Sequence, residues 1–270
     1  MISFDDTEIA FSNRSDKELE RAHFLFRFVG RPAFVRMGKV ALDMAFALRL
    51  PITGIIRSTV FAHFCGGENV KDCLPTIERL DRSGIKTLLD YSVEGKEAEE
   101  DFENAARETV RTIEMAANDE RLPFAVFKPT GFIRMDLMAK LNAKSKLSKA
   151  EEQEWRRAKK RVKNICQAGS SKGVFILIDA EETWIQDTID SLAEDMMQLF
   201  NKEKVVVYTT LQLYRKDRLD FLKKSYENAK KKGYKLGVKL VRGAYMEDER
   251  KRAKEQDYPS PIQDTKAETD

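Results

Sequence analysis

Five short apolar runs alternate with longer, charge-rich amphipathic segments from residue 85 onward. The runs occupy residues 85–90, 124–128, 174–179, 205–210 and 236–240. Their starts lie 31 to 50 residues apart, which leaves room for the helical crossover that joins two parallel strands. The pattern therefore predicts five successive βα units and a parallel sheet, which is an α/β fold.

Local signals mark the ends of the helices between these runs. Ser148 and Glu151 form a capping box, in which each residue satisfies a free backbone donor near the other. Asp217 is a residue type that caps helices, and Gly233 is one that ends them. The longest interval, between the second and third runs, holds an additional charged segment over residues 144–163.

Residues 1–84 show helical spacing instead of short apolar runs. Their helix signals are a capping box at Ser15 and Glu18, a first-turn proline at Pro32, a helix-ending proline at Pro51, and a third helix over residues 69–83 that contains Pro75 and ends at Gly84. No linker rich in proline, glycine or serine follows. We therefore predict an N-terminal helical segment, residues 1–84, packed on one sheet domain of residues 85–270.

Polar residues at the ends of the runs bear on the type of sheet. The chain contains neither G-x-G-x-x-G, which an open dinucleotide-binding sheet carries, nor a Walker loop. In a βα barrel, the active site lies at the carboxyl ends of the strands. The polar residues at or just past the five ends are Asp90 and Glu94, Lys128, Asp179 and Glu181, Thr210 and Gln212, and Lys239 and Arg242. This pattern favours a βα barrel, with five of the eight units present.

Composition excludes several classes of protein. Hydrophobic residues make up 42% of the 270 residues and charged residues 34%, which suits a folded domain. Forty-eight basic and 45 acidic side chains leave a net charge of +3, too even to indicate a nucleic-acid partner. Cys65, Cys73 and Cys166 form no CxxC, so neither a disulfide framework nor a cysteine zinc site is expected. The two histidines, His23 and His63, lie in the helical segment, and no metal site is expected.

The start of the chain does not look like a targeting signal. It is acidic and lacks a run of seven apolar residues, so neither a signal peptide nor a mitochondrial transit sequence is expected. The most apolar stretch, residues 32–50, carries charges that are costly in hydrocarbon, namely Arg36, Lys39, Asp43 and Arg49. We therefore expect a cytoplasmic protein without a transmembrane segment.

The charged residues at the strand ends allow more than one chemistry. Lys128, Lys239 and Arg242 are suited to binding a carboxylate or phosphate. Each could equally be a salt-bridge partner of the neighbouring acids. A lysine on a barrel strand could also be a Schiff-base nucleophile, so a lyase or aldolase that uses Lys128 or Lys239 is a second reading. After the fifth run, Gly243 and Ala244 are small enough to let a ligand approach the backbone, or to form an ordinary tight turn.

A third reading is a non-catalytic basic interaction protein. Its basis is two basic runs: Arg156, Arg157, Lys159, Lys160, Arg161 and Lys163, and then Lys230, Lys231 and Lys232. Such runs are usually solvated helix faces, and no interleaved aromatic residues indicate nucleic-acid stacking. The first run could instead contact an anionic membrane.

Several strings of residues resemble the proline dehydrogenase family, the flavoenzymes that oxidise L-proline. The resemblance extends over essentially the whole chain. Its specific part is KLVRGAY at 239–245, together with IDAEE at 178–182 and LQLY at 211–214 in that order. The other matching strings are FCGGE at 64–68, LDYSVEG at 89–95, FKPTGF at 127–132 and YPSPIQDTK at 258–266.

The resemblance implies a distorted (βα)8 barrel with FAD at the carboxyl ends of its strands. Asp179 matches an aspartate of the family's active site, and Ala180 beside it matches a residue that lies against the flavin. Gln212 matches a glutamine that hydrogen-bonds the isoalloxazine edge. The residues that match the FAD-binding segment are Arg242, Gly243 and Ala244.

The resemblance also implies a proline pocket. Lys128 matches the lysine that contacts the proline carboxylate, and Lys239 takes the place of a basic residue near flavin N5. Leu240 and Tyr245 match walls of the pocket. Glu94 resembles a glutamate that pairs with a late arginine and closes the site.

The implied reaction is hydride transfer from the ring carbon next to the proline nitrogen to flavin N5. The product is pyrroline-5-carboxylate, and the electrons then pass to a membrane quinone, with peripheral contact to the inner membrane as an expectation. In the family, further strands and a final helix supply an arginine pair for the proline carboxylate. We therefore expect the 1–270 chain to bind FAD weakly and to turn over proline slowly.

Overall fold

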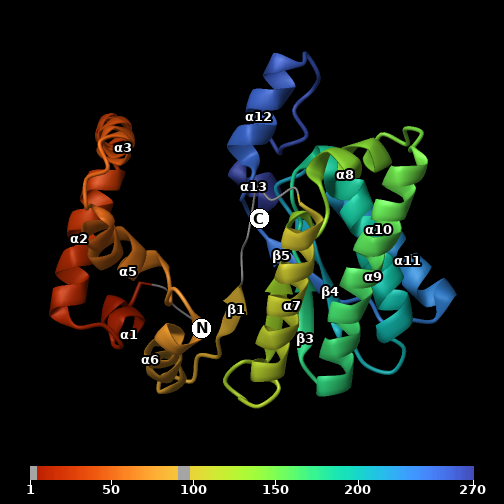
Figure 1. Cartoon of the computed structure of the whole chain (residues 1–270), viewed down its shortest axis with the longest axis horizontal. Helices are drawn as coiled ribbons and strands as arrows, with labels where there is room; N and C mark the ends of the chain where they lie inside the picture. Colours follow the sequence, from red (N-terminus) through yellow and green to blue (C-terminus); the bar gives the residue numbers. More distant parts are fainter. Residues whose placement is uncertain (1–4, 91–97) are drawn as a thin grey trace. The chain divides into compact units, whose positions relative to one another are not determined.

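The computed structural model describes residues 5–90 and 98–270, and the chain divides into two compact units. The first is Met1–Lys86 and the second is Thr87–Asp270. The second unit contains all five strands (Figure 1). Among the described residues, no helix combines the length and the apolar character needed to cross a bilayer.

The first unit is helical, as the sequence predicts. Its helices are α1 (Thr7–Phe11), α2 (Asp16–Val29), α3 (Pro32–Ala47), α4 (Thr53–Ile56), a π-helical turn (Arg57–Phe61), α5 (Ala62–Phe64) and α6 (Val70–Asp81). The capping box of Ser15 and Glu18 forms at the start of α2, and α3 begins at Pro32. Asn69 caps α6, which runs through Pro75 from Val70.

The second unit is built on a parallel sheet whose strand order follows the chain order. The strands are β1 (Leu88–Asp90), β2 (Phe124–Phe127), β3 (Phe175–Ile178), β4 (Val207–Gln212) and β5 (Val238–Val241), and all neighbours pair in parallel. A doubly wound sheet reverses its strand order at the ligand site, whereas a βα barrel adds each strand beside the last. The observed order β1-β2-β3-β4-β5 is that of a barrel, and the five predicted strands are confirmed with small shifts in their bounds.

Helices follow the strands, and several of them pack against the sheet (Figure 1). They are α7 (Glu99–Ala116), α8 (Met135–Asn142), α9 (Lys149–Lys172), α10 (Thr183–Phe200), α11 (Arg218–Lys232), α12 (Met246–Glu255) and α13 (Lys266–Thr269), with a 3-10 turn at Pro129–Gly131. The charged segment between the second and third strands, residues 144–163, holds most of α9, and α8 precedes it. The predicted capping box of Ser148 and Glu151 starts α9, and Gly233 ends α11 with a positive φ of 65°.

The predicted role of Asp217 as a side-chain cap is wrong. Helix α11 does begin at the next residue, but Asp217 forms no capping hydrogen bond. Its carboxylate instead accepts hydrogen bonds from Arg215 (2.8 Å) and from Arg218. Two guanidinium groups bind a carboxylate more strongly than a backbone N–H does. The Asp217 carboxylate therefore pairs with the arginines and does not cap the helix.

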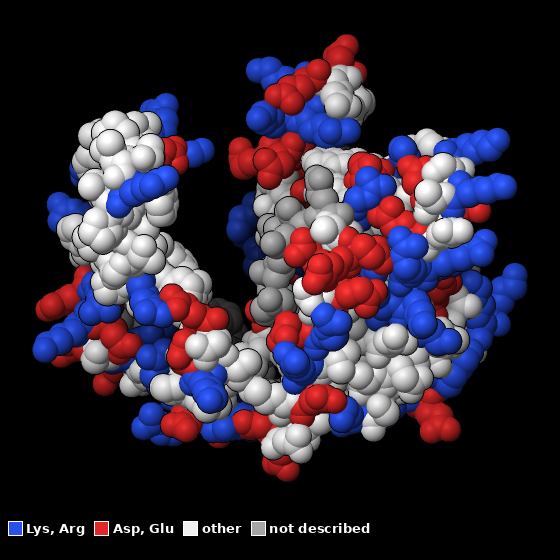
Figure 2. Space-filling model, in the orientation of Figure 1, with Lys and Arg blue, Asp and Glu red and all other residues white. Residues whose placement is uncertain are grey.

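The basic run of α9 is not a uniformly solvated face. Arg161 is only 4% exposed, bonds the Phe132 carbonyl (3.0 Å), and pairs with Glu99 and Glu103 of α7. Arg157 also pairs with Glu99 (2.6 Å). Figure 2 shows a group of acidic side chains beside a group of basic ones over α7 and α9. Part of the run therefore joins two helices.

The strands present two different faces. On the inner face, the rings of Phe124, Phe175 and Tyr208 form a cluster with centroids 5.1 to 6.1 Å apart. On the outer face, Ile176 contacts Gly169 of α9, where a Cβ atom would lie only 2.5 Å from the isoleucine side chain. Helix α9 can therefore approach β3 this closely only because residue 169 lacks a side chain.

We expect Gly169→Ala to destabilise the second unit. Alanine usually stabilises a helix interior by up to about 1 kcal/mol relative to glycine, but the clash with Ile176 should lower the free energy of unfolding by about 1–3 kcal/mol. Both tryptophans, Trp155 and Trp184, lie in this unit, so urea unfolding followed by tryptophan fluorescence reports on it directly. The control Gln167→Ala, at an exposed position of α9, should not lower stability. A Gly169→Ala protein as stable as the wild type would contradict the close packing.

Candidate active site at the carboxyl ends of the strands

Strand register places four polar residues level with one another on the inner face. The paired positions are Phe127 with Ile178, Ile178 with Thr209, and Thr210 with Lys239. The residues that follow at the same level are therefore Lys128, Asp179, Thr210 and Lys239. Because side chains alternate between the faces of a strand, these four lie above the aromatic cluster, toward the carboxyl ends. We call them the polar row.

Lys239 and Asp179 form an ion pair within the polar row. Lys239 Nζ lies 2.5 Å from Asp179 Oδ1, and the two side chains are 30% and 18% exposed. Thr210 Oγ1 donates to the Ile178 carbonyl (2.9 Å) and lies 3.5 Å from the same aspartate oxygen. The pair engages the lysine Nζ and fixes its position in the row. A Schiff-base nucleophile must offer a free amine, so the contact with a carboxylate disfavours Lys239 as a nucleophile.

Glu181 is a buried carboxyl group just past β3. It is 3% exposed and accepts hydrogen bonds from Thr130 N (3.0 Å) and Thr130 Oγ1 (2.6 Å). Burial raises the pKa of Glu181 to about 7, and the bonds from Thr130 and the charge of Lys128 oppose this shift. Burial also raises the pKa of Glu182, again opposed by Lys128. Lys128 therefore lies within electrostatic reach of two carboxyl groups.

Gln212 is held by contacts from three directions. Its Nε2 donates to the Glu181 carbonyl (2.8 Å) and to the Tyr214 hydroxyl (2.7 Å), while its Oε1 accepts from Arg215 (3.1 Å). Gln212 is 2% exposed and Arg215 5% exposed. The Tyr245 backbone N–H also approaches the Tyr214 hydroxyl, at 3.5 Å. The amide orientation of Gln212 is thus set by its neighbours.

The segment after β5 is open to solvent. Arg242, Gly243 and Ala244 are exposed, and Arg242 pairs with Asp270. Leu240 is 60% exposed and alternates to the opposite face of β5 from Lys239. The structure therefore does not bring Leu240 into the polar row. Ala180, next to Asp179, is buried at 8% exposure.

Glu94, the predicted closing residue, lies outside the described residues. The remaining predicted site residues separate into two groups. Lys128, Asp179, Gln212 and Lys239 gather on the inner face, and Arg242, Gly243, Ala244 and Tyr245 follow at the end of β5. Within the described ranges, 5–90 and 98–270, no cluster of three or more histidine, cysteine, aspartate or glutamate side chains is arranged to hold a metal ion.

Thr210 stands among the polar strand-end residues that the sequence predicts, but without an assigned role, and three further residues, Thr130, Tyr214 and Arg215, were not expected at the site. Thr210 belongs to the polar row, and Thr130, Tyr214 and Arg215 hold Glu181 or Gln212. Period-two alternation along the fourth run could have placed Thr210 on the same face as Gln212. No local pattern marks Thr130, because its partner is 51 residues away in sequence.

A barrel-type sheet with cations and carboxylates at its strand ends defines the class of protein: a βα-barrel protein with a charged site at the carboxyl ends of its strands. The family model described as proline dehydrogenase matches residues 73–270. The chain belongs to the proline dehydrogenase family.

Relatives and solved structures agree with this assignment. The carbapenem antibiotics biosynthesis protein CarD of Pectobacterium carotovorum is 38% identical over 198 residues, which are 73% of this chain and 53% of that protein. The mitochondrial proline dehydrogenase 1 of Arabidopsis thaliana is 30% identical over 81% of this chain and 52% of its own. The crystal structure of proline utilization A from Bdellovibrio bacteriovorus matches 97% of this chain and 28% of its own, with a TM-score of 0.67 and 18% identity. The chain spans about half the length of these curated relatives.

We expect Glu181 to make the stability of the second unit depend on pH. Because the pKa is raised in the folded state, the folded protein binds the proton more tightly than the unfolded chain does. The resulting contribution to the free energy of unfolding is fully present below pH 4.5, which is the ordinary pKa of a glutamate, and is lost as the pH rises through about 7. In urea unfolding, the free energy of unfolding of the wild type should therefore fall by about 2–3 kcal/mol more over this pH interval than that of Glu181→Gln.

The matched control is Glu227→Gln, at an exposed position of α11. It should leave the pH dependence of wild type unchanged. If Glu181→Gln and wild type lost the same free energy over the interval, Glu181 would not be the titrating group.

Proposed function

We propose that this protein oxidises L-proline to pyrroline-5-carboxylate, with FAD as its cofactor and a membrane quinone as electron acceptor. The observation that carries the proposal is the polar row, in which Lys128 and Lys239 flank Asp179 and Thr210 at the strand ends of a proline dehydrogenase family member. Residues 85–270 are the proposed catalytic domain, and residues 1–84 the proposed N-terminal helical segment that packs on it.

The residues at the strand ends fit a flavin dinucleotide. Gln212 Oε1 accepts one hydrogen bond, from Arg215, and a carbonyl oxygen has two lone pairs, so it can accept a second from a ring N–H. Arg242 is an exposed cation beside two small residues, Gly243 and Ala244, whose backbone a pyrophosphate can approach. Ala180 offers a small apolar side chain next to the polar row, as contact with a flat ring requires.

Three residues of the polar row have separate proposed roles. A bound flavin supplies the hydride acceptor, which no side chain can provide. Lys128 binds the proline carboxylate as a point charge. Lys239 supplies a positive charge that stabilises negative charge as it develops on the cofactor, and Asp179 keeps that ammonium in place. Tyr245 remains a proposed wall of the proline pocket and Glu94 its proposed closing residue, whereas Leu240 faces away from the polar row.

The flavin spectrum of the purified protein tests this function. We expect a flavin absorbance band that bleaches when proline is added without oxygen, and dye reduction that depends on proline. The Bdellovibrio protein in the solved structure was inactivated by N-propargylglycine, and the same compound should abolish the activity here. A protein without flavin that is trapped covalently by borohydride and substrate would establish the Schiff-base alternative instead.

We expect Lys239→Met to lower kcat/KM for proline by about 100-fold or more, because it removes a positive charge from the reacting centre. Lys239→Arg keeps the charge and should retain most of the activity. The control Lys235→Met changes an exposed lysine before β5 and should behave like wild type. Proline-dependent dye reduction measures all three, and wild-type activity in Lys239→Met would contradict the proposed role.

We also propose that unpaired lysines of α9 contact an anionic membrane near the quinone. Lys160 and Lys163 are exposed and line a groove of about 420 Å3 beside Leu199, which is 51% exposed. Basic side chains next to an apolar one suit the surface of an anionic membrane. Each cation near such a surface strengthens binding by about 1 kcal/mol.

The vesicle test must spare the arginines that hold α9 to α7. We expect Lys160→Glu combined with Lys163→Glu to reduce cosedimentation with phosphatidylserine vesicles several-fold. Lys224→Glu combined with Lys231→Glu, at two exposed positions of α11, is the charge-matched control, and we expect it to reduce binding much less. Undiminished binding of the double variant would place the contact elsewhere.

A further inference from the structure

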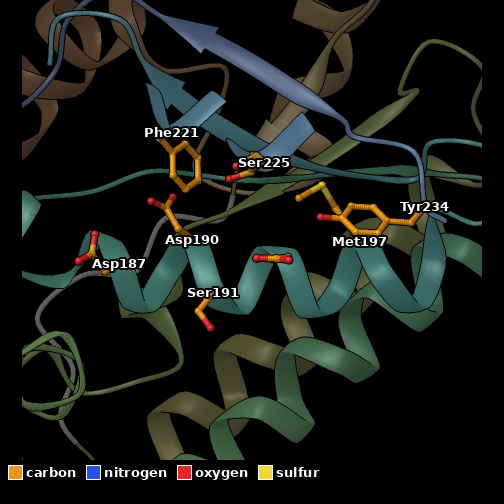
Figure 3. A pocket seen from close by; sticks show the side chains of 9 residues that line it. Asp187, Asp190, Ser191, Met197, Phe221, Ser225 and Tyr234 are labelled. Carbon is orange, nitrogen blue, oxygen red and sulfur yellow. The ribbon is translucent and has the colours of Figure 1, made fainter. Parts of the chain in front are cut away.

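A cavity of about 240 Å3 lies between α10, α11 and β4 (Figure 3). Figure 3 shows Asp190 projecting from α10 toward Phe221 of α11, with Met197 and Tyr234 beside each other at the opposite end. The residues that line the cavity are Asp187, Asp190, Ser191, Glu194, Met197, Thr209, Phe221, Ser225 and Tyr234. None of them belongs to the candidate active site.

The cavity and the candidate active site lie on opposite faces of β4. Thr210 belongs to the polar row and bonds the Ile178 carbonyl on the inner side. Thr209 is the preceding residue, and successive side chains of a strand point to opposite faces. Thr209 therefore faces the helices, and a molecule in the cavity would not occupy the proposed proline or flavin sites.

Two buried hydroxyl groups line the cavity without hydrogen-bond partners. They are Thr209 Oγ1 and Tyr234 Oη, on residues that are 3% and 6% exposed. Leaving a buried hydroxyl without a partner costs about 1–3 kcal/mol. Burial raises the pKa of Tyr234 to about 12, and the nearby Glu194 carboxylate adds to the shift through its charge and its side-chain contact with the hydroxyl. Tyr234 Oη thus faces Glu194 without a well-formed hydrogen bond, and its oxygen lone pairs, like those of Thr209, are left for a donor in the cavity.

All charged residues that line the cavity are acids. Asp190 is satisfied within the protein, since it accepts from Gln186 (2.8 Å) and pairs with Arg218 (2.7 Å). Glu194 uses Oε1 to pair with Lys232 at the surface (2.7 Å). Asp187 is exposed at the cavity's edge. This lining disfavours an anion and favours a cation.

An organic ammonium ion fits the lining better than water alone. A primary ammonium has three N–H donors and no acceptor, which matches a carboxylate and two hydroxyl oxygens. Met197 and Phe221 offer apolar surface to a carbon chain. Since a water molecule takes about 30 Å3 of liquid volume, the cavity has room for a molecule of about eight non-hydrogen atoms.

We propose that this cavity is a binding site for a small primary alkylammonium compound, held by Glu194, Thr209 and Tyr234. The site lies on the outer face of the barrel sheet and is separate from the proposed oxidation of proline. Its occupancy stabilises the packing of α10 against β4 and the segment after α11, because the ligand contacts Glu194 of α10, Thr209 of β4 and Tyr234, two residues past the end of α11.

Three probes of one chain length test the charge preference on the full chain. They are 4-amino-1-butanol, the neutral 1,4-butanediol and the anionic 4-hydroxybutanoate. Binding is measured by two-dimensional NMR titration, with shifts expected at residues of α10, α11 and β4. We expect saturable binding of the amine and at least about tenfold weaker binding of the other two. The reason is that a hydrogen bond between charged groups contributes more to affinity than one between neutral groups.

Near-isosteric variants test the named groups. Thr209→Val and Tyr234→Phe each remove one unpartnered hydroxyl, so they should leave the unliganded protein at least as stable while they weaken amine binding about tenfold. Glu194→Gln should remove the preference for the amine over the diol. The control is Tyr226→Phe, at an exposed tyrosine of α11. Its affinity for the amine should equal that of the wild type.

Three outcomes would overturn the proposal. The first is no saturable binding of the amine, which would leave a cavity that holds water only. The second is equal binding of the three probes. The third is unchanged amine affinity in the folded Thr209→Val, Tyr234→Phe and Glu194→Gln proteins. The NMR titration detects binding rather than proline oxidation, so its failure would leave the proposed enzymatic function untouched.

Discussion

The ion pair between Lys239 and Asp179 depends on the register in which β3, β4 and β5 pair. A slip of β5 by one residue would turn Lys239 to the outer face and leave Asp179 half-buried without its cation. Such a slip would also carry Val238 and Val241 to the wrong sides of the strand. Register and charge pairing thus reinforce each other, and together they fix the polar row on which the proposed chemistry rests.

A connected set of charges, all buried except Asp217, supports Gln212 beside this row. Arg215 donates to the Gln212 amide oxygen and pairs with Asp217, which also binds Arg218. Arg218 in turn pairs with Asp190 of α10, at 5% and 7% exposure. Buried charges are tolerated when each has a partner, and a complete network of this kind gives its members one arrangement. The orientation of Gln212 is therefore tied to the packing of α10 and α11.

The two faces of β4 carry different chemistry because alternation separates adjacent threonines. Thr210 completes the inner polar row, where every polar group has a partner or a proposed ligand. Thr209 faces the helices, where hydroxyls remain unsatisfied around an acidic cavity. A single strand thus joins the proposed site of proline oxidation to a proposed ammonium site through its backbone, with no shared side chain.

The sequence by itself determined the elements of this protein. Apolar runs predicted all five strands, and the capping boxes at Ser15 and Ser148 predicted helix starts, because these signals act between residues a few positions apart. Only the tertiary structure decided which charges meet. Lys239 and Asp179 are 60 residues apart, Arg161 turns inward to Glu99, and Asp217 binds two arginines instead of capping α11. These outcomes depend on register and helix packing, which bring together residues whose separation along the chain leaves no local pattern.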